Sequence, residues 1–86
     1  MTASLDTQLR EFLRDILGLS AERADSLTDD SGLFGELPEF DSMAVAAVLT
    51  GLEDVFHIQI DDDEVEGEIF ETFGNLRDFV SAKRGD

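Results

Sequence analysis

Residues 41–56 read DSMAVAAVLTGLEDVF, and this stretch predicts the helix around which the fold is organised. Its large apolar side chains recur at intervals of three and four residues, which is the spacing of one helix face. Asp41 is a favourable N-cap, so we expect the helix to begin at Ser42. We also expect it to be the most buried helix of the protein. The apolar residues concerned are Val45, Val48, Leu49, Leu52, Val55 and Phe56.

The residues before this helix predict another helix and a long loop. An apolar stripe between residues 5 and 16, with Ser4 as N-cap and Gly18 as a stop, indicates an amphipathic helix. Residues 19–40 hold two glycines, a proline and several Ser, Thr and Asp residues, which favours a loop with one helical turn near 21–26. A loop this long is uncommon, and burial of its large apolar side chains at about 25 cal/mol per Å² would pin it to the core. These side chains are Leu27, Leu33, Phe34, Leu37 and Phe40.

An extended link and two further helices are predicted after residue 56. The segment HIQI at 57–60 alternates but has no partner strand, so it is interpreted as an extended connection. The acidic run DDDE suits the N-terminus of a short third helix, which Gly67 weakens by up to about 1 kcal/mol. Lys83 and Arg84 favour the C-terminal end of a fourth helix. The apolar sides of these two helices are Val65, Ile69 and Phe70, and Phe73, Leu76, Phe79 and Val80.

The fold class that follows is all-α. We expect a small four-helix bundle, made of three main helices plus one short helix, with a long packed loop between helices one and two. With 86 residues the chain predicts a single domain over residues 1–86, whose core is too small for a deep enzyme cleft. It holds no cysteine, no basic secretion signal and no apolar run near the roughly 20 residues of a membrane span. A cytoplasmic monomer without membrane insertion is therefore expected.

The net charge of −15 is concentrated in the middle of the chain. Between residues 24 and 76 there are fifteen Asp or Glu residues and no Lys or Arg, while the flanks hold six of each sign. Such a field repels nucleic-acid phosphate and anionic lipid, and it attracts basic protein surfaces over about 8 Å at physiological salt. Nucleic acid is therefore not an expected partner. A solubilising surface and a docking surface for a basic protein both remain open interpretations.

The position of Ser42 admits two interpretations. As the first residue of a helix behind Asp41, it lies where free amides and the helix dipole favour an anion by roughly 0.3–1 kcal/mol. A phosphate joined covalently to its hydroxyl would use that preference, whereas an untethered phosphate would be held weakly. Asp and Ser are also simply favourable residues at a helix start, so the dipeptide alone does not decide between a cap and an attachment point.

Between residues 33 and 80 the chain resembles the acyl carrier proteins and, more broadly, the phosphopantetheine-carrying domains. The apolar loop LFGELPEF leads to DSM at the head of an aliphatic helix that ends in LEDVF. The link HIQI, the acidic start DDDEV and the helix introduced by TFGNL follow in order. The predicted first helix also fits the family. This combination favours the carrier interpretation of Ser42 over a simple cap.

The resemblance implies a non-catalytic carrier. The serine that matches Ser42 would hold 4′-phosphopantetheine from coenzyme A through a phosphodiester, with Asp41 and Met43 beside the attachment point. A separate phosphopantetheinyl transferase would attach the arm. The arm would supply a thiol on which acyl or aminoacyl groups travel as thioesters between enzymes. Those partners would be an acyl- or aminoacyl-activating ligase and acyltransferase or synthase enzymes.

Partner recognition is expected on the exposed face of the helix that follows Ser42. Fatty-acid-type carriers often have acidic residues along this face, whereas this chain has alanines in the turns after Ser42 and acidic side chains only near the helix end. The departure indicates a flatter, more apolar docking patch and a specialised stand-alone carrier. The expected partner-binding residues are Met43, Ala46, Ala47, Glu53 and Asp54.

Other functions are less well supported by the sequence. A serine hydrolase would pair Ser42 with His57, but fifteen positions along one helix separate them by about 22 Å. A calcium loop at DDDEVEG would place Phe73 where a bidentate glutamate belongs, so no metal site is expected. The main alternative is an unmodified acidic helical interaction module that docks a basic partner through residues 61–71.

Overall fold

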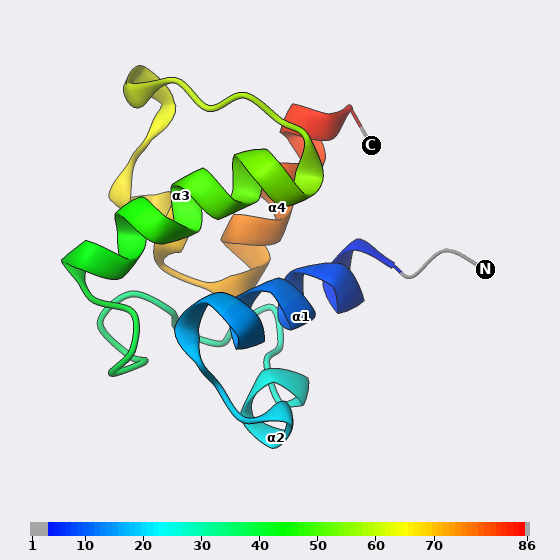
Figure 1. Ribbon diagram of the computed structural model, residues 1–86, viewed down its shortest axis with the longest axis vertical. Coiled ribbons are helices and arrows are strands. Elements are labelled where there is room, and N and C mark those ends of the chain that lie inside the picture. The colour runs from blue at the N-terminus through cyan, green and yellow to red at the C-terminus, as the bar shows by residue number, and fades with distance from the viewer. Residues whose placement is uncertain (1–3, 86) are drawn as a thin grey trace.

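The computed structural model describes residues 4–85, so residues 1–3 and 86 of the expected domain lie outside the described residues. Figure 1 shows three longer helices packed together, with short helical turns in their connections. The all-α bundle with its long packed loop is confirmed, and α2 is the single turn expected within that loop. The elements are α1 (Leu5–Leu17), α2 (Ala21–Asp25), α3 (Ser42–Phe56), the 3₁₀ helices η1 (Asp62–Glu64) and η2 (Gly67–Phe70), and α4 (Phe73–Arg84).

The ends of the long helices follow local sequence signals. Ser4 caps α1 by accepting a hydrogen bond from the Thr7 amide at 3.2 Å, and Gly18 ends it in the left-handed region at φ 72°. Asp41 caps α3 in the same way, since its Oδ1 accepts from the Ala44 amide at 2.9 Å. Each cap lies within three residues of its hydrogen-bond partner, which is why the sequence predicts these helix starts.

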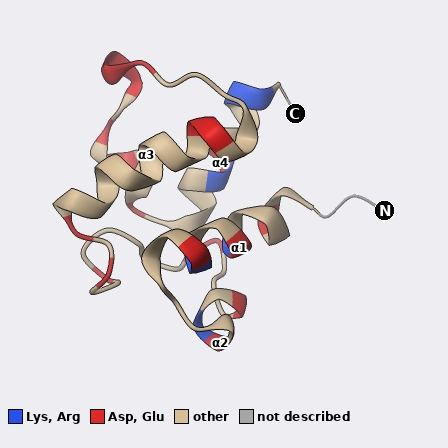
Figure 2. Ribbon diagram, in the orientation of Figure 1, with Lys and Arg blue, Asp and Glu red and all other residues tan. Residues whose placement is uncertain are grey.

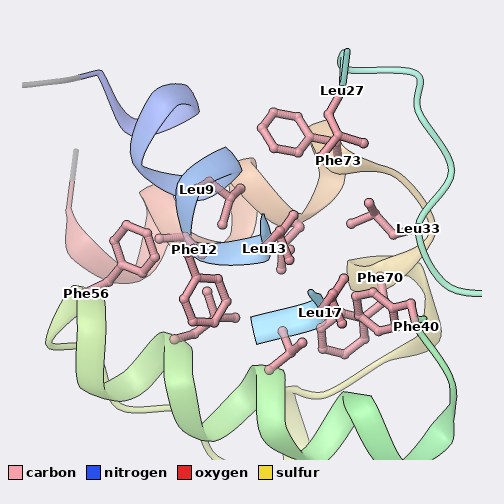
Figure 3. Close-up of a cluster of buried hydrophobic side chains, with 14 of the residues drawn as sticks. Leu9, Phe12, Leu13, Leu17, Leu27, Leu33, Phe40, Phe56, Phe70 and Phe73 are labelled. Carbon is pink, nitrogen blue, oxygen red and sulfur yellow. The ribbon is translucent and has the colours of Figure 1, made fainter. Parts of the chain in front are cut away.

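The hydrophobic core lies where α1, α3 and α4 meet (Figure 3). The rings of Phe12 and Phe56 lie 6.0 Å apart on one side of it, and those of Phe40 and Phe70 lie 5.5 Å apart on the other. No buried polar or charged residue interrupts this core among residues 4–85. Burial of apolar side chains is therefore its main source of stability. The largest fully buried ones are Phe40, Phe73, Leu9, Leu13, Leu33, Leu52, Leu76, Val48 and Val80.

The prediction that α3 is the most buried helix was wrong. It buries three of its fifteen residues, whereas α1 buries four of thirteen and α4 four of twelve. One face of α3 packs on α1 and α4 while the opposite face meets solvent, and Val55, which was expected within the apolar stripe, is 52% exposed. The helix therefore offers apolar side chains to other molecules.

Backbone hydrogen bonds seat the loop between α2 and α3 on the start of α4. Four of them join residues 29–34 to residues 70–74, and Gly32 and Thr72 form an isolated antiparallel bridge there. The loop is thus held by its backbone as well as by its side chains. The donor–acceptor pairs are Leu33–Glu71 (3.1 Å), Phe34–Phe70 (2.9 Å), Phe73–Ser31 (2.8 Å) and Gly74–Asp29 (3.0 Å).

All but one of the large apolar side chains of this loop are at least half-buried and anchor it to the core. Leu27, Leu33 and Phe40 are buried and Leu37 is half-buried, as expected for a loop pinned to the core. Phe34 is 48% exposed, so its expected burial was wrong. Its ring stays at the surface, where it lies edge-on to the buried ring of Phe40 at 6.0 Å.

The expected short third helix is instead two separate 3₁₀ turns. Glu64 closes η1 by accepting from the Asp61 amide at 2.9 Å, and it also binds the Lys83 ammonium of α4 at 2.8 Å. The contact with Asp61 is part of a capping box at the start of η1, and the contact with Lys83 ties this turn to α4. Val65 and Glu66 then adopt extended conformations, so no continuous helix joins the acidic run to η2.

The guanidinium of Arg77 ties three segments together. It donates to Asp6 of α1 at 3.3 Å, to Asp29 of the loop at 3.2 Å and to the neighbouring Asp78 at 3.2 Å. The hydrogen bonds from Arg77 lower the pKa of Asp29 below its ordinary value. These ion pairs, which we call the Arg77 latch, therefore join α1, the loop and α4.

Replacing Gly74 with alanine should destabilise the protein by about 1–3 kcal/mol, because the new Cβ would lie 2.9 Å from the Asp29 carbonyl oxygen and crowd the loop backbone. Urea denaturation measures this loss. Gly67→Ala is the matched control, since a Cβ there meets nothing within 4 Å. Equal stability of the two variants would contradict the close seating of the loop.

The variant Arg77→Met should lower the melting temperature by a few degrees at pH 7. The folded pKa of Asp29 is lowered, so its contribution is present above its unfolded pKa and is lost as pH falls through the folded value. The difference from wild type should therefore shrink below about pH 4. Melting curves at several pH values test this, with Arg14→Met, which removes only an exposed 3.5 Å pair, as the control. A difference that is constant with pH would refute the latch.

Removal of the α3 cap by Asp41→Ala should cost about 1 kcal/mol of unfolding free energy, because the Ala44 amide loses its acceptor. Asp41→Asn should recover most of that loss, since an amide oxygen accepts the same hydrogen bond. Chemical denaturation of the two variants compares them directly. If asparagine were as damaging as alanine, the role of Asp41 would lie in its charge and not in capping.

Candidate functional site

Ser42 lies exposed at the first turn of α3. The preceding Asp41 is in an extended conformation and turns its carboxylate toward the Ala44 amide, away from the serine. The Ser42 hydroxyl makes no hydrogen bond to any residue within 4–85. The side chain is thus free to react and is presented at the rim of the molecule.

The segment that leads into Ser42 is held from two sides. Arg23 of α2 donates to Glu39 at 2.8 Å, and these hydrogen bonds lower the pKa of Glu39 to about 2. Phe40, the next residue, is buried in the core. Asp41 then caps the helix. The chain is therefore fixed immediately before the serine, while the serine itself is uncovered.

Exposed apolar side chains lie next to the serine in sequence and on the loop before it. Met43, the next residue, is 83% exposed, and Phe34 on the loop is 48% exposed. A groove of about 180 Å³ runs between the loop, the first turns of α3 and η2. Its lining residues are Phe34, Val45, Val65, Glu66, Gly67 and Phe70.

The surroundings of Ser42 fit a covalently attached phosphate. The amides of Ser42 and Met43 make no hydrogen bond inside the described chain, and they lie at the positive end of the α3 dipole. The Ala44 amide is already satisfied by Asp41. A phosphodiester on the serine would meet free donors and water, so no buried group would lose its partner.

The expected partner-binding residues separate into two places. Met43, Ala46 and Ala47 are all exposed and form one stripe that begins beside Ser42. Asp54 is exposed but lies twelve residues along α3, which is about 18 Å from Ser42 at 1.5 Å per residue.

Glu53 has a role within the fold. It is half-buried, and its Oε2 accepts a hydrogen bond from the Ile60 amide at 3.0 Å, which holds the link after α3 against the helix. His57 is exposed and ends α3 at φ 56°. It therefore lies at the opposite end of the helix from Ser42 and does not contact it.

Sequence reasoning missed Phe34 as part of this site. It was expected in the core because hydropathy alone does not distinguish a buried aromatic side chain from an exposed one. The residue after it, Gly35, has φ 89° and marks a turn at the surface. An aromatic residue directly before such a turn is a signal that could have placed Phe34 outside.

Two comparisons with known proteins agree with this geometry. The family model described as "Phosphopantetheine attachment site" matches residues 7–82. The solution structure of a holo acyl carrier protein from Nitrosomonas europaea is 44% identical, covers 99% of this chain and 100% of its own, and superposes with a TM-score of 0.84. A comparison with curated proteins finds no match.

Two negative findings apply to residues 4–85. No helix there is long and apolar enough to cross a membrane, and no group of three or more His, Cys, Asp or Glu side chains is arranged to hold a metal ion. The family match extends over most of the chain, including all of α3 and most of α1 and α4. The chain therefore belongs to the phosphopantetheine-attachment family of non-catalytic carrier proteins.

Proposed function

We propose that the protein is an acyl carrier whose 4′-phosphopantetheine arm is attached to Ser42, with residues 1–86 forming a single carrier domain. Family membership supplies the carrier role and the covalent cofactor. The position is supported by one observation above all: the Ser42 hydroxyl is exposed and unbonded on the first residue of α3. Asp41 and Met43 complete the attachment site on either side.

The residues at this site have separate tasks. Asp41 fixes the start of α3 and so holds Ser42 at the positive end of the helix. The free amides of Ser42 and Met43 favour the negative phosphodiester by about 0.3–1 kcal/mol. The bound arm supplies a terminal thiol on which acyl or aminoacyl groups are carried as thioesters. Because the arm is tethered, one carrier presents its cargo to several enzymes at high local concentration.

The partners are modifying and biosynthetic enzymes. We assign them as a phosphopantetheinyl transferase, an acyl- or aminoacyl-activating ligase, and acyltransferase or synthase enzymes, acting on a monomer in the cytoplasm. Met43, Ala46 and Ala47 offer them a flat apolar stripe beside Ser42. Figure 2 shows Asp and Glu along the connections and near the end of α3, whereas Lys and Arg lie on α1, α2 and α4. That distribution favours partners with basic surfaces.

An unmodified acidic docking module is not favoured. It would account for the charge, but it gives no reason for a free serine hydroxyl at a helix start or for the family match over residues 7–82.

Intact mass measurement tests the attachment. Purified apo-protein is incubated with coenzyme A, magnesium and a promiscuous phosphopantetheinyl transferase. The wild type should gain one phosphopantetheine, and Ser42→Ala should gain none, because the proposed acceptor oxygen is gone. Circular dichroism should show that Ser42→Ala keeps the helical content of the wild type.

Ser26→Ala is the matched control, because Ser26 is exposed but lies at the end of α2. It should be modified as fully as the wild type. Modification of Ser42→Ala would move the attachment to another residue. A folded wild type that several transferases leave unmodified would favour the docking module.

A further inference from the structure

A second groove lies between α1 and α3, which run side by side in Figure 1. Its volume is about 580 Å³, several times that of the groove beside Ser42. The ring of Phe12 and the backbone of Gly51 form its floor, and the partly exposed side chains of Ile16 (36%) and Val55 (52%) form its apolar walls. Gly51 lets α1 approach α3 closely here, because a Cβ on it would lie 2.7 Å from the Phe12 ring.

Carboxylates line the rim of this groove. Glu11 and Asp15 of α1 and Asp54 of α3 are all exposed and belong to its lining. Within residues 4–85 the one ion pair among them is a 3.5 Å contact from Arg14 to Asp15. Arg84 lies near one end, where it donates to Gln8 at 3.4 Å. The groove therefore combines an apolar floor with a rim of mostly unpaired negative charge.

The groove is remote from the attachment site. Asp54 and Val55 lie twelve and thirteen residues along α3 from Ser42, which is about 18–20 Å. The exposed large apolar residues divide accordingly: Phe34 and Met43 lie near the serine, and Ile16 and Val55 lie in the α1–α3 groove. A molecule bound in this groove would leave the Ser42 end of α3 uncovered.

We propose that the α1–α3 groove binds an amphipathic helix of a partner protein, in which Lys or Arg residues flank large apolar side chains. The apolar side chains occupy the floor between Ile16 and Val55, and the basic residues pair with Glu11, Asp15 and Asp54. Anionic lipid and nucleic acid are repelled by the same rim. The volume is typical of a binding pocket, and an apolar helix face seated in a groove is a common mode of recognition.

This interaction anchors the carrier without covering its serine. A partner held there raises the local concentration of Ser42 for active sites linked to that partner. The proposal does not depend on modification of Ser42, so it can be tested in a chain that cannot be modified.

The test uses ¹⁵N-labelled Ser42→Ala protein and two synthetic helical peptides of about 18 residues, or five turns. Both peptides have the same Leu and Phe face, and one has Lys and the other Glu on its flanks. NMR titration should show saturable shifts of amides in 8–16 and 51–55 with the Lys peptide. The Glu peptide should bind at least about tenfold more weakly, because three charge pairs become repulsive.

Matched variants test whether the peptide binds in this groove or is attracted only by the overall negative charge. Glu11→Gln combined with Asp54→Asn should weaken the Lys peptide about fivefold, and Val55→Ser should weaken it about threefold. There are two controls: the double variant Glu22→Gln with Glu68→Gln, and the single variant Met43→Ser. Each should leave the affinity for the Lys peptide within about twofold of the wild-type value. The proposal is overturned if the shifts centre on 31–45 or 61–71, if the controls weaken binding as much, or if no saturable binding occurs.

Discussion

The backbone hydrogen bonds between residues 29–34 and 70–74 are the constraint on which the rest of the structure depends. They place a loop of low regularity on the start of α4, and the apolar anchors Leu33 and Phe40 can then fill the core. Phe40 in turn fixes the residue before the Asp41 cap. The position of Ser42 is therefore set by contacts with a helix more than thirty residues later in the chain.

Much of the fold could be predicted because its signals are local. Helix starts at Ser4 and Asp41 depend on a side chain and an amide three residues apart, and apolar spacing identifies the faces of α1 and α4. The errors concern non-local contacts. Where the third helix was expected, Glu64 is held by Lys83 of α4, and no spacing within 61–70 contains that contact.

The same distinction applies to the site. Ser42 could be proposed from the sequence because its cap and its family motif lie in one short stretch. The burial of Glu53 could not, because its acceptor role depends on how the link at Ile60 folds back. Asp54 is exposed, yet it lines the α1–α3 groove, whose other side is formed by α1. A residue on a predicted helix face can be assigned to a surface only when its tertiary neighbours are known.

The contact between α1 and α4 has a consequence for synthesis on the ribosome. Leu9 and Leu13 emerge early, but the last helix that covers them ends at Arg84. At a synthesis rate of about 5–20 residues per second, these side chains lack their native neighbours for several seconds. During that time the acidic middle of the chain repels other nascent copies and limits their association. The native surroundings of the serine are completed only after α4 has left the ribosome, so enzymes that recognise the folded carrier can act on it only from that point.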